Sequence, residues 1–147
     1  MIDPIRLLQH VHGHVGWLAA AVLVHPAIVL RRKKKADWAV GSAVGLATIA
    51  GGMGAWLYPS YRERLKQGIF QEAPAIGYLF ERKEHLAFAA VALAWVGGLA
   101  YVVARTTDES PTRDSLRKAS QVSFTIAAAL AIVVAALGTT IAAFRSF

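Results

Sequence analysis

Four long apolar stretches decide what this chain of 147 residues can fold into. They cover about residues 11–30, 36–58, 86–104 and 119–144, and the charged residues gather in short segments between them. Crossing the hydrocarbon core of a bilayer takes roughly 20 apolar residues. A segment inside lipid must satisfy its backbone hydrogen bonds internally, so each stretch is expected to be a helix. The sequence therefore predicts an all-α integral membrane four-helix bundle, with residues 1–147 forming a single transmembrane domain.

The connection between the second and third stretches, residues 60–84, is long and partly apolar. Pro59 is expected to end the second span, because a proline cannot donate a backbone hydrogen bond to a continuing helix. Beyond it, Tyr61, Leu65 and Ile69 recur every four residues with charged residues between them, which predicts a short amphipathic interfacial helix. Since the connection is too apolar for a free linker, we expect it to cover one mouth of the bundle.

The net charge of +7 comes from 16 Lys and Arg against nine Asp and Glu. These cations flank apolar spans, as lipid head groups and the positive-inside bias favour, so the expected partner is the lipid bilayer and no nucleic acid is expected. Nine of the 16 cations fall on the side of the first loop, five of them in the run 31–35. That density predicts a multi-pass protein of the inner membrane with a cytoplasmic first loop and both termini outside, in the periplasm.

Histidines are the candidate functional residues. Three of the five, His10, His12 and His14, lie at the start of the first span, and His85 opens the third. Ionisable side chains within membrane segments are rare and usually functional. Because the first and third spans start on the same side of the membrane, these four histidines are expected at one level. The chain has no cysteine, which excludes thiolate-held metals, iron–sulfur clusters and covalently attached haem.

One interpretation of this pattern is a haem b held by two imidazoles on facing helices of the bundle. His14 is the most deeply inserted of its cluster and His85 has no rival on its helix, so they are the expected axial pair. The chain would then be an electron-transfer subunit or partner of a respiratory or redox complex, fed by a quinol, rather than a stand-alone enzyme. Trp17 is expected to cover the porphyrin, and the propionates to pair with Arg62, Arg82 and Lys83.

A second interpretation is a metal site without porphyrin. Imidazole and carboxylate donors suit zinc, copper or iron, and the sequence offers enough of both near the start of the first and third spans. The candidate ligands are His10, His12, His14, Glu81 and His85.

The third interpretation has no cofactor, because histidine at a bilayer interface can hydrogen-bond water, head groups or carbonyls. The chain would then be a non-catalytic structural or accessory subunit of a larger membrane complex, or a homo-oligomer. Gly41-x-x-x-Gly45 in the second span is a small-residue packing motif that serves either tight packing inside the bundle or such an interface. The role of His25, near the other face of the membrane, stays open.

The arrangement resembles small four-helix membrane cytochromes of the b type, whose ligands project from the helices of a bundle. That resemblance implies a His-ligated haem. In length and number of spans the chain is also similar to the HemJ-type protoporphyrinogen oxidases, and His14-Val15-Gly16-Trp17 resembles the His and Trp that this family carries in its first span. It departs from that family in the third span, where the only nearby lysine is Lys83, before the expected helix.

Overall fold

Four long helices dominate the computed structural model, which describes residues 4–32 and 34–144. Each is long and apolar enough to cross a membrane, and no strand occurs in these described ranges. The prediction of an all-α, four-helix membrane bundle is confirmed. The elements are α1 (Pro4–Arg31), α2 (Asp37–Tyr61), the π-helical turn η1 (Arg62–Lys66), the short α3 (Gln67–Glu72), α4 (Pro74–Thr106) and α5 (Ser110–Phe144).

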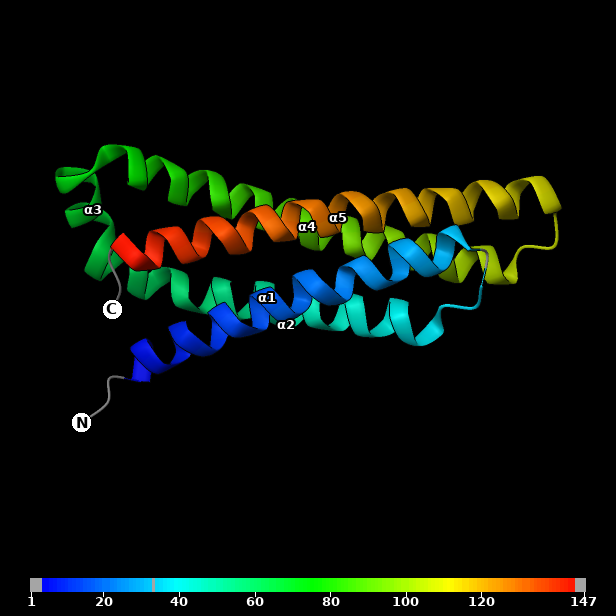
Figure 1. Cartoon of the computed structure of the whole chain (residues 1–147), viewed down its shortest axis with the longest axis horizontal. Coiled ribbons are helices and arrows are strands. Elements are labelled where there is room, and N and C mark those ends of the chain that lie inside the picture. The colour runs from blue at the N-terminus through cyan, green and yellow to red at the C-terminus, as the bar shows by residue number, and fades with distance from the viewer. Residues whose placement is uncertain (1–3, 33, 145–147) are drawn as a thin grey trace.

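The long helices run up and down and form a four-cornered bundle (Figure 1). Both α1 and α4 pack along α2 and α5, so α1 and α4 stand diagonally opposite each other. The loops that join α1 to α2 and α4 to α5 lie at one end, which carries many cations and is called the basic end below. At the other end, called the α3 end, lie η1, α3, the start of α1 and the end of α5.

The core is built where small residues let helices approach closely. Leu23 and Phe124 are its largest fully buried apolar side chains in the middle of the bundle, with Ala94 packed beside them. Between α4 and α5, Ser120 Oγ donates a hydrogen bond of 2.7 Å to the carbonyl of Gly97. A Cβ on Gly97 would lie only 3.0 Å from the Phe124 ring. Close approach of this kind gains van der Waals contact that lipid does not replace, which favours association of α4 with α5.

Two helices extend further than predicted. The helix α2 does not end at Pro59 but continues to Tyr61, where η1 takes over without a break. A proline removes only its own N–H from the helix. Three residues further on, Arg62 N–H bonds the carbonyls of Pro59 and Tyr58, so the helical path is kept. The helix α4 starts already at Pro74, because proline is favoured in a first turn, where its missing donor would have no partner.

The amphipathic segment predicted around residues 60–71 is present as η1 and α3. Its apolar stripe, Tyr61, Leu65 and Ile69, is buried against Phe80 and its neighbours on α4. The stripe therefore folds back onto the protein, and the segment joins α2 to α4 as a packed turn of helix at the α3 end.

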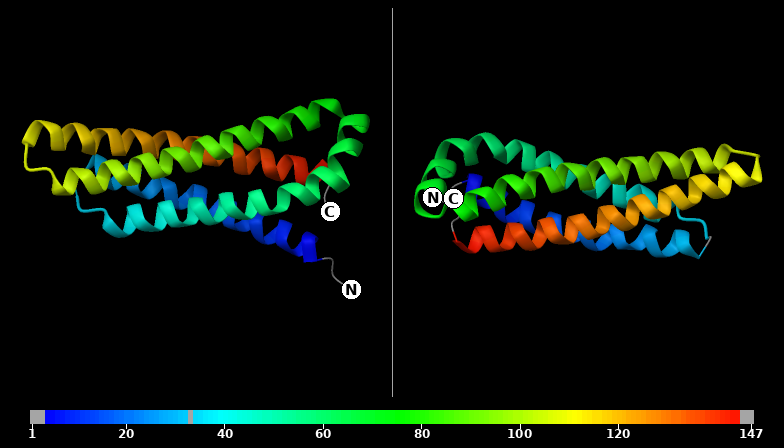
Figure 2. Two further views of the ribbon diagram at one scale, coloured as in Figure 1. Left: turned by 180° about the vertical axis from the view of Figure 1, so that it is seen from behind. Right: turned by 90° about the horizontal axis from the view of Figure 1, so that it is seen from above.

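The N-terminal part of α1 diverges from the other three helices towards the α3 end, as two opposite views show (Figures 1 and 2). The buried residues of α1 accordingly begin only at Ala19 and continue to Leu30. The bundle is thus closely packed at its middle and basic end, and more open where the histidines lie.

Candidate functional site

Four residues, one from each long helix, form two contact pairs towards the α3 end. These are His12 on α1, Gly54 on α2, Lys83 on α4 and Gly138 on α5, called the His12–Lys83 cluster below. A Cβ on Gly54 would lie 3.3 Å from His12 Cε1, and one on Gly138 would lie 3.9 Å from Lys83 Cδ. Two diagonal helices thus each supply a nitrogen-bearing side chain, and the glycines of the other two leave room for them.

Helix rotation explains why these residues face inward. His12 stands seven residues before the buried Ala19, and Lys83 stands seven residues before the buried Ala90. Seven residues turn an α-helix by about 700°, roughly 20° short of two full turns, so both side chains continue the core-facing stripe. The glycines extend the stripes of their own helices in the same way: Gly54 is seven residues past buried Ala47, and Gly138 is fourteen past buried Phe124.

The imidazole of His12 carries an unsatisfied polar atom. Its Nδ1 is buried and has no hydrogen-bond partner among the described residues. Leaving a buried polar atom unpaired costs about 1–3 kcal/mol. A group that binds this ring would remove that cost, which makes His12 the histidine best prepared to hold a ligand.

Lys83 extends along the bundle interior towards an aromatic pair. Its Nζ lies 4.2 Å from the centroid of the Phe80 ring. Phe80 in turn stacks on Tyr61, with ring centroids 3.6 Å apart and an angle of 6° between the planes. The hydroxyl of Tyr61 is a second buried polar atom without a hydrogen-bond partner in the described part of the chain. The wall of the cluster at the α3 end is therefore aromatic, with one cation and one free hydroxyl.

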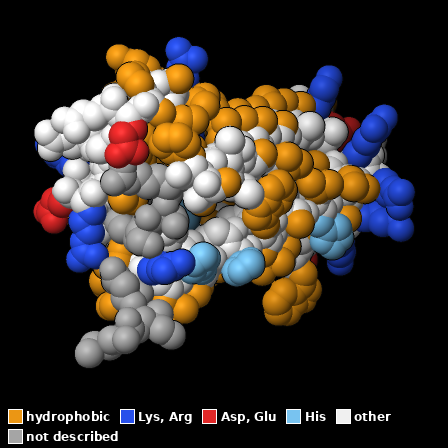
Figure 3. Space-filling view, turned by 60° about the vertical axis from the view of Figure 1, so that its left-hand side comes forward, with side chains coloured by type: hydrophobic (Ala, Val, Ile, Leu, Met, Phe, Trp, Pro, Cys, Tyr) orange, Lys and Arg blue, Asp and Glu red, His pale blue; other side chains and the backbone are white. Residues whose placement is uncertain are grey.

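The predicted axial pair lies elsewhere. His14 and His85 are both exposed, as is His10, and Figure 3 shows histidine side chains on the outer surface of the bundle. His85 Nδ1 lies 2.8 Å from the carbonyl oxygen of Glu81, one turn earlier on the same helix. Each exposed residue is two positions from its inward neighbour, a rotation of about 200° that directs it to the opposite side of the helix. Haem ligation by His14 and His85 stays a prediction.

The other predicted site residues lie around this end without joining the cluster. Trp17 Nε1 donates a 3.1 Å hydrogen bond to Thr139 Oγ1, which braces α1 against α5. Glu81 forms a 2.8 Å ion pair with Lys66, which holds η1 against α4. Arg62 and Arg82 are exposed.

Within residues 4–32 and 34–144, no three His, Asp or Glu side chains come together as a metal-binding group. The donors that the sequence offered for zinc, copper or iron are thus divided between the surface of α1, the surface of α4 and the interior. What sequence reasoning missed is the inward direction of Lys83 and the role of Gly54 and Gly138. The sequence carries no clear signal for them, because the spacing to Ala90 and Ala47 becomes informative only once those alanines are known to be buried.

No family model matches the chain, and no curated protein and no solved structure matches it either.

Proposed function

We propose that this membrane protein carries electrons through a haem b held at the His12–Lys83 cluster. The observation that supports the proposal is the imidazole of His12, which enters the bundle interior with one buried nitrogen unpaired. Lys83, on the diagonal helix, offers a second nitrogen from a side chain that packs beside Gly138. The residues that would hold the haem are therefore His12 and Lys83, the latter after loss of its ammonium proton, in place of the exposed His14 and His85.

The donor set fits a haem in three respects. An imidazole and an amine are both nitrogen ligands, and they come from helices on opposite sides of the bundle axis. Glycines at positions 54 and 138 leave room on the two remaining helices for the side chains of His12 and Lys83. Exposed Arg62 and Arg82 at the α3 end are available to pair with propionates.

When bound, a haem b supplies a one-electron carrier whose potential depends on its ligands and surroundings. The chain's own contribution would be to position the haem and to exclude water from it. His12 and Lys83 hold the group from two sides, and the stacked rings of Tyr61 and Phe80 close the α3 end. The hydrogen bond from Trp17 to Thr139 fixes the start of α1 against α5, which limits how far His12 can move.

We propose an inner-membrane location with the basic end in the cytoplasm. Figure 3 shows Lys and Arg side chains gathered at that end of the bundle. The positive-inside bias then places the His12–Lys83 cluster near the periplasmic face, with both termini on that side. Electrons would pass between a quinol and a periplasmic carrier or a neighbouring subunit.

A second candidate function is that of an accessory subunit or homo-oligomer without a cofactor. It is favoured by Gly41 and Gly45, which lie exposed on the outside of α2 with nothing within 4 Å of a Cβ built on either. These glycines therefore take no part in tight packing inside this bundle, which was one of the two roles considered for the motif. An unfilled Gly-x-x-x-Gly face is suited to close contact with another membrane helix.

The test is an optical spectrum of the detergent-purified protein, produced in haem-replete cells and recorded oxidised and dithionite-reduced. We expect a Soret band that is lost in His12→Ala and in Lys83→Leu, since neither new side chain can bind iron. The matched controls are His14→Ala and His85→Ala, which change exposed residues two positions away and should keep the band. Electron paramagnetic resonance of the oxidised protein then separates histidine–lysine from bis-histidine ligation.

Three outcomes contradict the proposal. If His14→Ala and His85→Ala lose the band while His12→Ala keeps it, the surface histidines are the ligands. A colourless protein that contains stoichiometric zinc, copper or iron would show that the bound group is a metal ion and not a haem. A colourless, metal-free protein that purifies in its native oligomeric state would favour the accessory-subunit function. Gly41→Ile should then release the chain from its complex.

A further inference from the structure

The basic end carries a second site that is separate from the histidines. A cavity of about 300 Å³ lies between the end of α1 and the first turns of α5. Its lining residues are Leu30, Arg31, Asp114, Arg117, Lys118 and Gln121. The α5 members recur every three or four residues, so they share one face of that helix.

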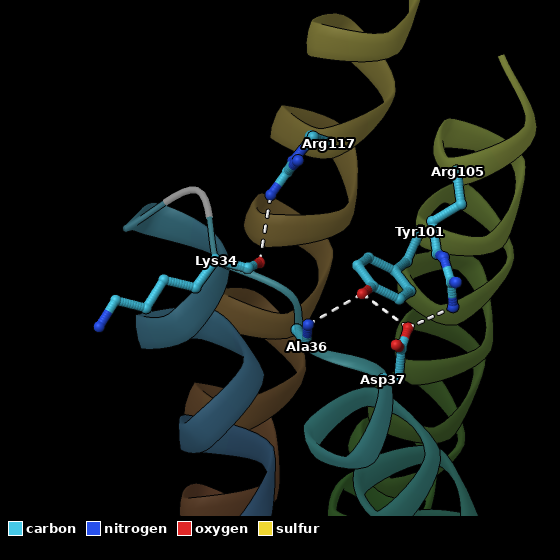
Figure 4. A network of polar contacts seen from close by, with 6 residues as sticks. All are labelled: Lys34, Ala36, Asp37, Tyr101, Arg105 and Arg117. Atoms are coloured by element: carbon cyan, nitrogen blue, oxygen red, sulfur yellow. Dashed lines mark hydrogen bonds and ion pairs between the residues drawn. The ribbon is translucent and has the colours of Figure 1, made fainter. Parts of the chain in front are cut away.

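The lining is cationic. It contains the side chains of Arg31, Arg117 and Lys118 against the single carboxylate of Asp114, a formal balance of three positive charges and one negative. Arg117 is held in place, because its Nη2 donates a 3.2 Å hydrogen bond to the carbonyl oxygen of Lys34 (Figure 4). The cavity therefore has in its lining a guanidinium that is held in place, and the charge of this group favours an anionic oxygen as ligand.

The loop that supports this guanidinium is itself tied down (Figure 4). The N–H of Ala36 donates a 2.8 Å hydrogen bond to the hydroxyl of Tyr101, which donates in turn to Asp37 at 2.9 Å. Asp37 also pairs with Arg105. These bonds connect the loop after α1 to α4, two residues along the chain from the Lys34 carbonyl that accepts the hydrogen bond of Arg117.

The depth of the cavity matches a lipid head group. The first apolar span ends at about residue 30 and the fourth begins at about residue 119, and the lining residues straddle both limits. Buried Leu30 forms an apolar side of the cavity where acyl chains would begin. Basic pockets between transmembrane helices at this level are typical sites for anionic lipid head groups.

From these observations we infer that the cavity binds the phosphate of an anionic phospholipid in the leaflet at the basic end. Arg117 and Lys118 contact the phosphate oxygens, and Arg31 contributes from α1. Asp114 opposes binding and sets the affinity below that of an all-cationic site. This site does not depend on the proposed haem.

The test measures lipid binding to the purified full chain by native mass spectrometry in a neutral detergent. The probes are phosphatidylglycerol, phosphatidylcholine and inorganic phosphate. We expect phosphatidylglycerol to bind more tightly than phosphatidylcholine, and Lys118→Gln to weaken it about fivefold, as removal of one cation near the membrane surface implies. Asp114→Asn should have the opposite effect and tighten the binding of phosphatidylglycerol, because it removes the single carboxylate of the lining.

Arg113→Gln is the matched control, because it removes an exposed cation of α5 that does not line the cavity. Arg117→Gln should weaken binding as well, but it also removes the bond to Lys34, so Lys118→Gln is the decisive variant. Equal weakening by Lys118→Gln and Arg113→Gln would mean a diffuse surface charge and overturn the site. Displacement of the lipid by millimolar inorganic phosphate would overturn the lipid as occupant in favour of a free anion.

Discussion

Replacing His12 by leucine should stabilise the cofactor-free protein while abolishing its proposed function. The buried Nδ1 of His12 has no hydrogen-bond partner in the described residues, and such an atom costs about 1–3 kcal/mol. Leucine removes that cost and fills a similar volume between α1 and Gly54. The change of shape costs up to about 1.5 kcal/mol, since His12 Cε1 lies close to Gly54. The net expectation is a gain of roughly 1 kcal/mol in the free energy of unfolding.

The assay is reversible unfolding by sodium dodecyl sulfate in mixed micelles, followed by far-ultraviolet circular dichroism on protein purified without cofactor. His14→Leu is the control, because its side chain is exposed on the same helix and should change stability by no more than about 0.5 kcal/mol. If His12→Leu is less stable than His14→Leu by 1 kcal/mol or more, a hydrogen bond already satisfies the ring. The reasoning from an unpaired nitrogen would then be refuted.

Three further substitutions test the packing that positions the site. Tyr101→Phe should lower the free energy of unfolding by about 1–3 kcal/mol in the same assay, because the buried N–H of Ala36 loses its acceptor. Gly97→Ala should lower it by a similar amount, about 1–3 kcal/mol, since the new Cβ would lie 3.0 Å from the Phe124 ring. Trp17→Phe should cost only about 0.6 kcal/mol, the typical value of one hydrogen bond between membrane helices, and should weaken cofactor retention measured by dialysis.

Each of these has a matched control on the surface. Tyr78→Phe and Trp56→Phe change exposed rings, and Gly41→Ala adds a methyl group where nothing lies within 4 Å. We expect the two aromatic controls to be neutral and Gly41→Ala to be neutral or slightly stabilising, because alanine is the better helix former. A core variant that behaves like its control would show that the contact it removes does not stabilise the bundle.

The element pattern could be predicted from the sequence because the bilayer leaves a chain few choices. Four apolar stretches of sufficient length must be helices, and successive crossings of the bilayer make consecutive helices antiparallel. The same alternation predicts the N-terminal histidines and His85 in the same half of the bundle, and the start of α1 and the first half of α4 do lie together towards the α3 end (Figure 1). The exact helix ends were less predictable, since Pro59 is tolerated where the neighbouring donors still find partners.

Which residues form the site depends on the rotation of each helix about its own axis. The pattern of apolar residues along the sequence does not encode that rotation. A soluble helix reveals its inward face by an alternation of apolar and polar residues. In a membrane helix the faces towards lipid and towards the core are both apolar, and α4 has almost no such periodicity. Depth along the helix therefore favoured His14 and His85, whereas rotation about the helix axis brings His12 and Lys83 inward.

The sequence by itself thus determined that this is a membrane bundle of four helices, which end bears the histidines and which end bears the cations. The tertiary structure alone decided which side chains share an interior, because each helix is rotated by the fit of small residues such as Gly97 against Phe124. The same fit, carried two heptads along α5, sets Gly138 beside Lys83. Close packing of backbones, rather than the exclusion of water, fixes these rotations in lipid, so the site emerges only when all four helices are in place.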